Sequence, residues 1–156
     1  MNNPLLSLPK RTSLFVAAIR EPSENDLRVI VVEGKHQSAR ADSPVRGAVP
    51  VEPDETSRAF EITWWGYVAH SVRNESYWRQ EVGENVDGSR FGTRENSAFL
   101  RYVSETTFAC ADFPGPLVHW FLYTERHCID VVSVDAPEVK EISVSQVVWD
   151  LGDRPS

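Results

Sequence analysis

The residues best suited to chemistry in this 156-residue chain gather in one apolar stretch, Leu117–Val134. His119, His127, Cys128 and Asp130 all lie within it. A histidine held by an aspartate can act as a general base, or as a metal ligand whose ring is oriented by the carboxylate. Whether any of these side chains meet depends on how the stretch folds.

The stretch has the pattern of a buried β-hairpin, because polar residues interrupt two apolar runs. A loop at Glu125–Arg126 sets Tyr123 opposite Cys128. His119 and Asp130 then become diagonal neighbours on one face, within reach of a hydrogen bond, whereas a three-residue loop would separate them. The opposite, core-facing side then holds Trp120, Leu122, Ile129 and Val131.

The His119–Asp130 pair has a functional and a structural interpretation. In the functional one, Arg73 and Glu75 add polar groups to a pocket on the same face, and the chain is a small-molecule binder or an enzyme. In the structural one, Asp130 anchors a turn or a cross-strand contact, and His119 is neutral and satisfied by it. A concave, solvent-reachable pocket shared by His119, Asp130 and Arg73 or Glu75 would favour the functional interpretation.

Neither a metal nor a cofactor is expected. His127 and Cys128 are neighbours along one strand and point to opposite faces, and no Cys-x-x-Cys pair accompanies them. The sequence also has no Gly-rich phosphate loop, no Gly-x-Ser-x-Gly and no His-Glu-x-x-His. No residue is therefore assigned as catalytic, and a non-enzymatic role is favoured while an enzyme stays open.

A second group of candidate residues is aromatic. Trp65, Tyr67, Tyr77 and Trp78 follow one another near a strand pattern, and aromatic residues with polar tips are over-represented in clefts and interfaces. Trp65 is the informative member, since alternation places it on the face opposite Trp64. We expect these four residues to form an interface; the alternative is that they are the core and rim of a curved sheet.

The elements that must position these residues are mostly strands. Alternation and turn residues predict about seven strands, and Phe99, Leu100 and Val103 behind a cap at Asn96 or Ser97 predict one short helix. Short turns favour an antiparallel meander, so we predict an α+β, mostly β fold with a strongly curved sheet or open barrel. The expected strands cover residues 13–19, 27–33, 59–72 with a bend at Gly66, the hairpin 117–134, and 142–151.

The length of the chain fits a single domain over residues 1–156. Residues 1–12 are predicted to be a polar tail. Residues 34–56 carry three prolines and no periodicity, which predicts a long mobile loop.

Charge and cysteine content restrict the partners and the compartment. The net charge of −7 argues against a nucleic-acid binder and would steer a basic partner toward the chain. The apolar run Leu14–Ile19 is shorter than the roughly 7–15 residues of a signal core, and no stretch approaches the roughly 20 apolar residues of a membrane helix. We therefore expect a cytoplasmic protein, with Cys110 and Cys128 reduced.

Several short motifs resemble a family of small uncharacterised bacterial proteins over about residues 58–142. The resemblance implies a bacterial cytoplasmic protein of one domain and brings no activity with it. Proteins of this size and style are often toxin-neutralising immunity proteins or accessory subunits. The motifs that carry it are Phe60-Glu-Ile, Tyr67-Val-Ala, Arg73-Asn-Glu-Ser, Phe99-Leu-Arg-Tyr-Val, His119-Trp, His127-Cys-Ile-Asp-Val-Val-Ser and Pro137.

Taken together, the sequence favours a non-enzymatic, acidic protein-interaction module whose partner has a basic surface. The alternative is a small-molecule binder or enzyme with its pocket on the face of His119 and Asp130. A homo-oligomer is a further alternative. Another is a subunit of a larger assembly, which would present an exposed apolar edge strand near Val144–Trp149.

Overall fold

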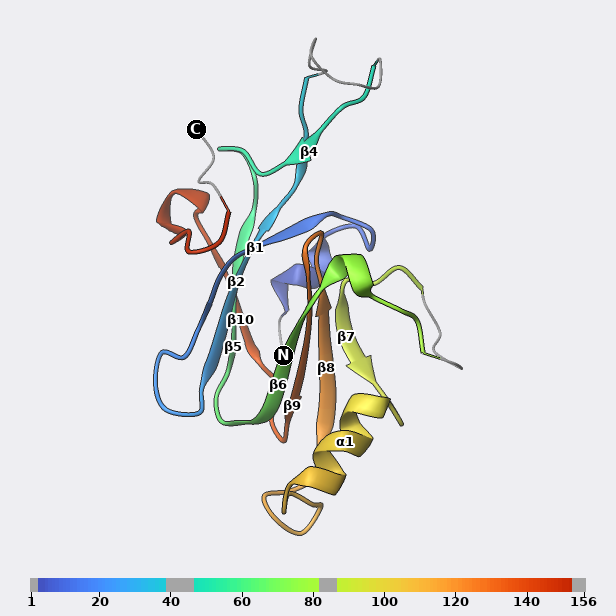
Figure 1. The fold of residues 1–156 in the computed structure, drawn as a ribbon. Coiled ribbons are helices and arrows are strands. Elements are labelled where there is room, and N and C mark those ends of the chain that lie inside the picture. The colour runs from blue at the N-terminus through green and yellow to red at the C-terminus, as the bar shows by residue number, and fades with distance from the viewer. Residues whose placement is uncertain (1–2, 39–46, 82–86, 153–156) are drawn as a thin grey trace.

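The computed structural model describes residues 3–38, 47–81 and 87–152, whose strands form two four-stranded sheets and a two-stranded ribbon, all antiparallel (Figure 1). The first sheet has the order β1 (Leu14–Arg20), β2 (Leu27–Glu33), β5 (Ala59–Trp64), β10 (Glu138–Ile142). The second has the order β6 (Tyr67–Asn74), β9 (His127–Ser133), β8 (Val118–Tyr123), β7 (Phe91–Arg94). The other elements are β3 (Lys35–His36), β4 (Val51–Glu52), α1 (Ala98–Thr106) and the 3₁₀ helices η1 (Pro4–Ser7), η2 (Glu75–Tyr77) and η3 (Val144–Gln146).

The two sheets pack face to face over one core. Alternation along each strand sends one set of side chains inward, so that Phe60 and Ile62 of β5 meet Ile129 and Val131 of β9 in a single buried cluster. The mostly β fold with one α-helix is thus confirmed for the described residues. The single curved sheet or open barrel is not confirmed, because the strands divide between two sheets.

The last predicted strand, residues 142–151, is wrong. β10 begins earlier and ends at Ile142, because Ser143 and Gln146 form a reciprocal capping box that starts η3. The chain then crosses the outer face of the first sheet, where Val147 packs in a second buried cluster with Ala17, Ala18, Ile30, Val32 and Ala59. The exposed apolar edge strand considered for Val144–Trp149 is therefore not formed.

The predicted polar tail, residues 1–12, includes the short helix η1. Leu5 is buried in the main core, because Asn3 caps η1 and turns the chain so that Leu5 and Leu8 pack against it. Residues 1–2 lie outside the described part of the chain.

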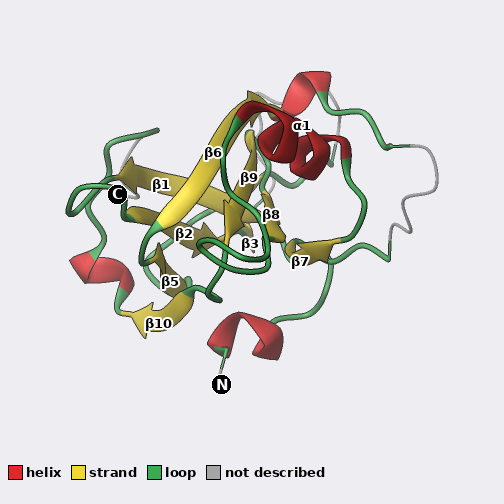
Figure 2. Ribbon diagram, turned by 90° about the horizontal axis from the view of Figure 1, so that it is seen from below, coloured by secondary structure: helices red, strands yellow, loops and turns green. Residues whose placement is uncertain are grey.

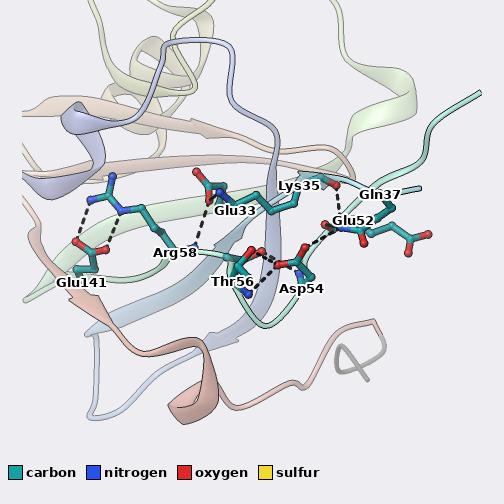
Figure 3. A network of polar contacts seen from close by, with 9 residues as sticks. Glu33, Lys35, Gln37, Glu52, Asp54, Thr56, Arg58 and Glu141 are labelled. Carbon is teal, nitrogen blue, oxygen red and sulfur yellow. Dashed lines mark hydrogen bonds and ion pairs between the residues drawn. The ribbon is translucent and has the colours of Figure 1, made fainter. Parts of the chain in front are cut away.

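The predicted loop over residues 34–56 falls partly on residues 39–46, outside the described part of the chain. On either side of that gap β3 pairs with β4, with Lys35 opposite Glu52. A network of polar contacts extends from the base of this ribbon into the first sheet (Figure 3). The contacts include Gln37 to Asp54 at 3.0 Å, Lys35 to Glu33 at 2.9 Å and Arg58 to Glu141 at 2.8 Å.

No helix in the described part of the chain is long and apolar enough to cross a membrane.

Candidate functional site

The β8–β9 hairpin has the predicted register. Thr124 N–H donates to the His127 carbonyl at 2.8 Å, which leaves Glu125–Arg126 as the loop, and Tyr123 lies opposite Cys128. His119 and Asp130 therefore share the outer face of the second sheet, as the hairpin argument requires.

Three side chains of the second sheet and Ser97, which precedes α1, form one hydrogen-bonded row. The Nε2 atom of His119 lies 2.7 Å from Oδ1 of Asp130, and Oδ2 of Asp130 accepts from Arg73 at 2.7 Å. The Nδ1 atom of His119 lies 2.5 Å from Oγ of Ser97. If Nε2–H donates to the carboxylate, Nδ1 is left to accept the Ser97 hydroxyl proton, so every member of the row has a partner.

Ser97 joins this row because it begins α1. Its side chain caps the helix by accepting the Leu100 N–H at 3.1 Å, and the helix lays Phe99 edge-on against the ring of His119, with centroids 5.5 Å apart. The predicted helix and its cap at Ser97 are confirmed. The contact between Ser97 and His119 was not predicted, because residues 22 positions apart in sequence meet here only through packing of the helix on the sheet.

The order serine, histidine, aspartate is also that of the triads of acyl transfer, in which the hydroxyl is the nucleophile. Here Ser97 is only 2% exposed, and its oxygen is already engaged as the helix cap. Arg73 also neutralises the charge of Asp130. The geometry therefore gives the row a positioning role, in which it fixes the start of α1 and the guanidinium of Arg73.

A pocket of about 280 Å³ opens between α1 and the segment that follows η2, with the second sheet as its floor. His119, Asp130 and Arg73 all border it, as the functional interpretation requires. We call it the α1 pocket. Its other walls include Trp78, Arg79, Glu81, Arg94, Phe99 and Tyr102.

Glu75 does not reach the α1 pocket. It lines a neighbouring cavity, also of about 280 Å³, together with Cys128. Burial raises the pKa of the Cys128 thiol to about 11, with smaller opposing effects of Arg73 and Asp130, so the thiol stays protonated at neutral pH and is a poor nucleophile. Of the four pocket candidates, the structure thus brings together His119, Asp130 and Arg73 and leaves Glu75 apart.

The four aromatic candidates lie at the two ends of β6. Trp65 and Tyr67 stand at the start of that strand, whereas Tyr77 and Trp78 follow its end, about 25 Å away for eight extended residues. Trp65 is exposed and Trp64 buried, as alternation predicts. The four residues therefore do not share one patch.

The end of the molecule that carries Trp65 also displays two phenylalanines. Phe108 is 100% exposed and Phe113 is 75% exposed in the connection from α1 to β8. This connection is held by paired main-chain hydrogen bonds between Cys110 and Phe113, at 2.8 and 3.1 Å.

Strand pairing brings three turns to this same end. Tyr67 and Val118 both pair with Ser133, and Leu27 pairs with Trp64, so the starts of β2, β6 and β8 lie together. In Figure 1 the turn at residues 21–26 and the turn at Trp65–Gly66 lie at the lower left and the connection at residues 107–117 lies at the bottom, and Figure 2 views the molecule from below. We call this region the acidic end, for the carboxylates described below.

Among the described residues, no three His, Cys, Asp or Glu side chains are grouped so that they could hold a metal ion.

Comparisons with known protein families, with characterised proteins and with solved structures give no match.

Proposed function

We propose that the chain is a non-enzymatic protein-interaction module that binds a basic partner through its acidic end. The observation that carries the proposal is the display of Trp65, Phe108 and Phe113 on ordered turns at one end of the molecule. Large aromatic side chains are costly to leave in water, and they dominate the binding energy of protein interfaces.

The order of these turns supports the proposal. The Gly66 N–H donates to Asp26 at 2.7 Å, and the Tyr67 N–H donates to the Asn25 carbonyl at 2.9 Å. These hydrogen bonds join the turn at residues 21–26 to the turn at residues 65–66. A surface that is already ordered loses little conformational entropy when a partner docks.

The charge of the acidic end supports a basic partner. Glu21, Glu24, Asp112 and Asp135 all lie on the three turns or on the adjacent turn between β9 and β10, and none of them forms an ion pair with Lys or Arg in the described part of the chain. Carboxylates that form no ion pair with Lys or Arg in the described part of the chain, and that lie near exposed apolar side chains, favour a basic surface and speed its association at low salt.

A toxin with a basic active cleft would suit this surface, and the chain would then be a toxin-neutralising immunity protein. An accessory subunit that docks on a basic enzyme would use the same residues. Both assignments, together with a bacterial cytoplasmic setting, belong to this proposal.

The test is co-purification at low salt from the source cell with three forms of the chain. We expect the wild type to retain a stoichiometric basic partner, and the double variant Phe108→Ser/Phe113→Ser to lose at least about tenfold in affinity. The single variant Tyr77→Ser removes an equally exposed aromatic ring at the opposite end of β6 and should retain the partner. Raising the salt concentration should slow association of the wild type.

Absence of a stoichiometric partner at low salt would contradict the proposal. So would a partner that the double variant retains as well as the wild type does.

The α1 pocket supports a second candidate function, the binding of a small molecule. The observation in its favour is the convergence of His119, Asp130 and Arg73 on one cavity. This site lies on the outer face of the second sheet, beside the helix that leads to the acidic end, so both functions could reside in one chain.

A further inference from the structure

We propose that the α1 pocket binds a small ligand that carries a carboxylate or phosphate group next to a flat apolar ring. This inference rests on the second candidate function and names its ligand class. It does not depend on the proposal that a basic partner binds at the acidic end.

Arg73 supplies the first part of the site. A guanidinium has five N–H donors, and the described contact of Arg73 uses one of them, to Asp130. Its side chain is 54% exposed, so the remaining donors are accessible from the pocket. The row through Asp130, His119 and Ser97 holds the guanidinium in place, which lowers the entropy lost on binding.

Arg79 supplies the second part. It borders the same pocket from the segment that follows η2, and within the described residues it makes no ion pair. Two guanidinium groups converging on one cavity match the planar oxygen pairs of carboxylates and phosphates.

The two carboxylates that border the α1 pocket are already engaged. Asp130 is fully buried and already shared between Arg73 and His119, and Glu81 accepts the Ala98 N–H at 3.0 Å. Arg73 and Arg79 therefore face two carboxylates that already have partners, in a chain whose net charge is −7. An anion that binds here does so against the overall charge, which makes nonspecific attraction a poor explanation.

Aromatic walls define the rest of the ligand. Trp78, Phe99 and Tyr102 flank the arginines, and aromatic faces pack well against flat rings. The volume of about 280 Å³ is at the small end of the roughly 300–1,000 Å³ that is typical of ligand pockets. A ligand of about one ring with one anionic group fits these limits.

The experiment is calorimetric titration of the full chain with benzoate, phenyl phosphate and neutral phenol. We expect saturable one-to-one binding of at least one of the two anions, with phenol at least about tenfold weaker. The stronger of the two anions distinguishes a carboxylate ligand from a phosphate ligand. Arg79→Gln should weaken anion binding about tenfold or more, since it removes a charged hydrogen-bond donor and no described structural contact.

Arg126→Gln is the matched control. It makes the same change of charge on the β8–β9 loop, where Arg126 lies over Phe15 and outside the α1 pocket. Its affinity for the anions should stay within about twofold of the wild type.

Three results would overturn the inference. If neither anion binds saturably at millimolar concentration, the pocket is not an anion site. If Arg126→Gln weakens binding as much as Arg79→Gln, the attraction comes from overall charge. If phenol binds as tightly as the anions, the ligand class is wrong while the pocket of the second candidate function remains.

Discussion

At the scale of single residues, Ser97 joins α1 to the second sheet, and its replacement should lower the stability of the fold. Ser97→Ala deletes the cap of α1 and leaves Nδ1 of the buried His119 without its partner. We expect a loss of about 2 kcal/mol in the free energy of unfolding, measured by urea denaturation.

The matched control for this prediction is Ser104→Ala, an exposed serine within the same helix. Alanine is the better helix former there, so stability should be unchanged or slightly higher. A loss below about 0.5 kcal/mol for Ser97→Ala would show that the hydrogen-bonded row does not fasten the helix.

The same residues show what local sequence can predict about the site. Counting from a two-residue loop was sufficient to pair His119 with Asp130, because a β-hairpin fixes its register over a few residues. The sequence indicates Ser97 only as a cap and Arg73 only as a polar neighbour, since their contacts with His119 and Asp130 depend on how α1 and β6 pack on the hairpin. Such long-range packing leaves no periodic pattern in the sequence.

At the scale of elements, the segment after η3 acts as a cover for the first sheet. Asp150 and Leu151 N–H groups both donate to the Ala17 carbonyl, at 2.8 and 2.9 Å, at the irregularity between Val16 and Ala18 of β1. Arg20 adds two hydrogen bonds of 2.6 Å to Asp150. With the second sheet on the inner face and this cover on the outer face, most side chains of β1 and β2 are kept out of water.

Neighbouring valines on this cover allow a paired test. Val147 is 5% exposed and Val148 is 46% exposed. Val147→Asp buries an unpaired carboxylate and should cost about 3 kcal/mol or more in unfolding free energy, whereas Val148→Asp should change it by less than about 0.5 kcal/mol. Equal effects of the two variants on the denaturation midpoint would show that the segment does not cover the sheet.

The wrong prediction of a strand over this segment has an identifiable cause. The apolar residues Val144, Val147 and Val148 are typical of a strand. Ser143 and Gln146, however, have the three-residue spacing of a capping box, and this spacing is the signal in the sequence for a helical turn.

At the scale of the whole molecule, the class of fold followed from the sequence but the arrangement of its sheets did not. Hairpins such as β1–β2 and β8–β9 are local and were predicted. The pairing of β2 with β5 across the ribbon, of β6 with β9, and of β10 with β5 joins strands that are distant in sequence. The choice between one curved sheet and two packed sheets depends on these distant pairings, because the same alternation of apolar and polar residues along the strands is compatible with both folds.

Two histidines should give the whole molecule an acid-sensitive stability at mildly acidic pH. Burial lowers the pKa of His70, opposed weakly by Glu21, and burial together with Arg126 lowers the pKa of His127. Between these lowered values and about 6.5, the unfolded chain binds more protons than the folded chain, so stability rises with pH and falls on acidification. We expect the free energy of unfolding to decrease from about pH 7 to pH 5, and the double variant His70→Gln/His127→Gln to flatten this decrease.

The control for the pH experiment is Glu141→Gln. The hydrogen bond from Arg58 lowers the pKa of the Glu141 carboxyl, so its contribution is present above the unfolded value of 4.5 and is lost only as pH falls through the folded value. This variant should therefore alter the acid limb below about pH 5 and leave the slope between about pH 7 and pH 5.5 unchanged. The outcome against the prediction is a free energy of unfolding that changes equally steeply with pH in the wild type and in the double histidine variant between about pH 7 and pH 5.5. It would show that burial of His70 and His127 does not couple protonation to folding.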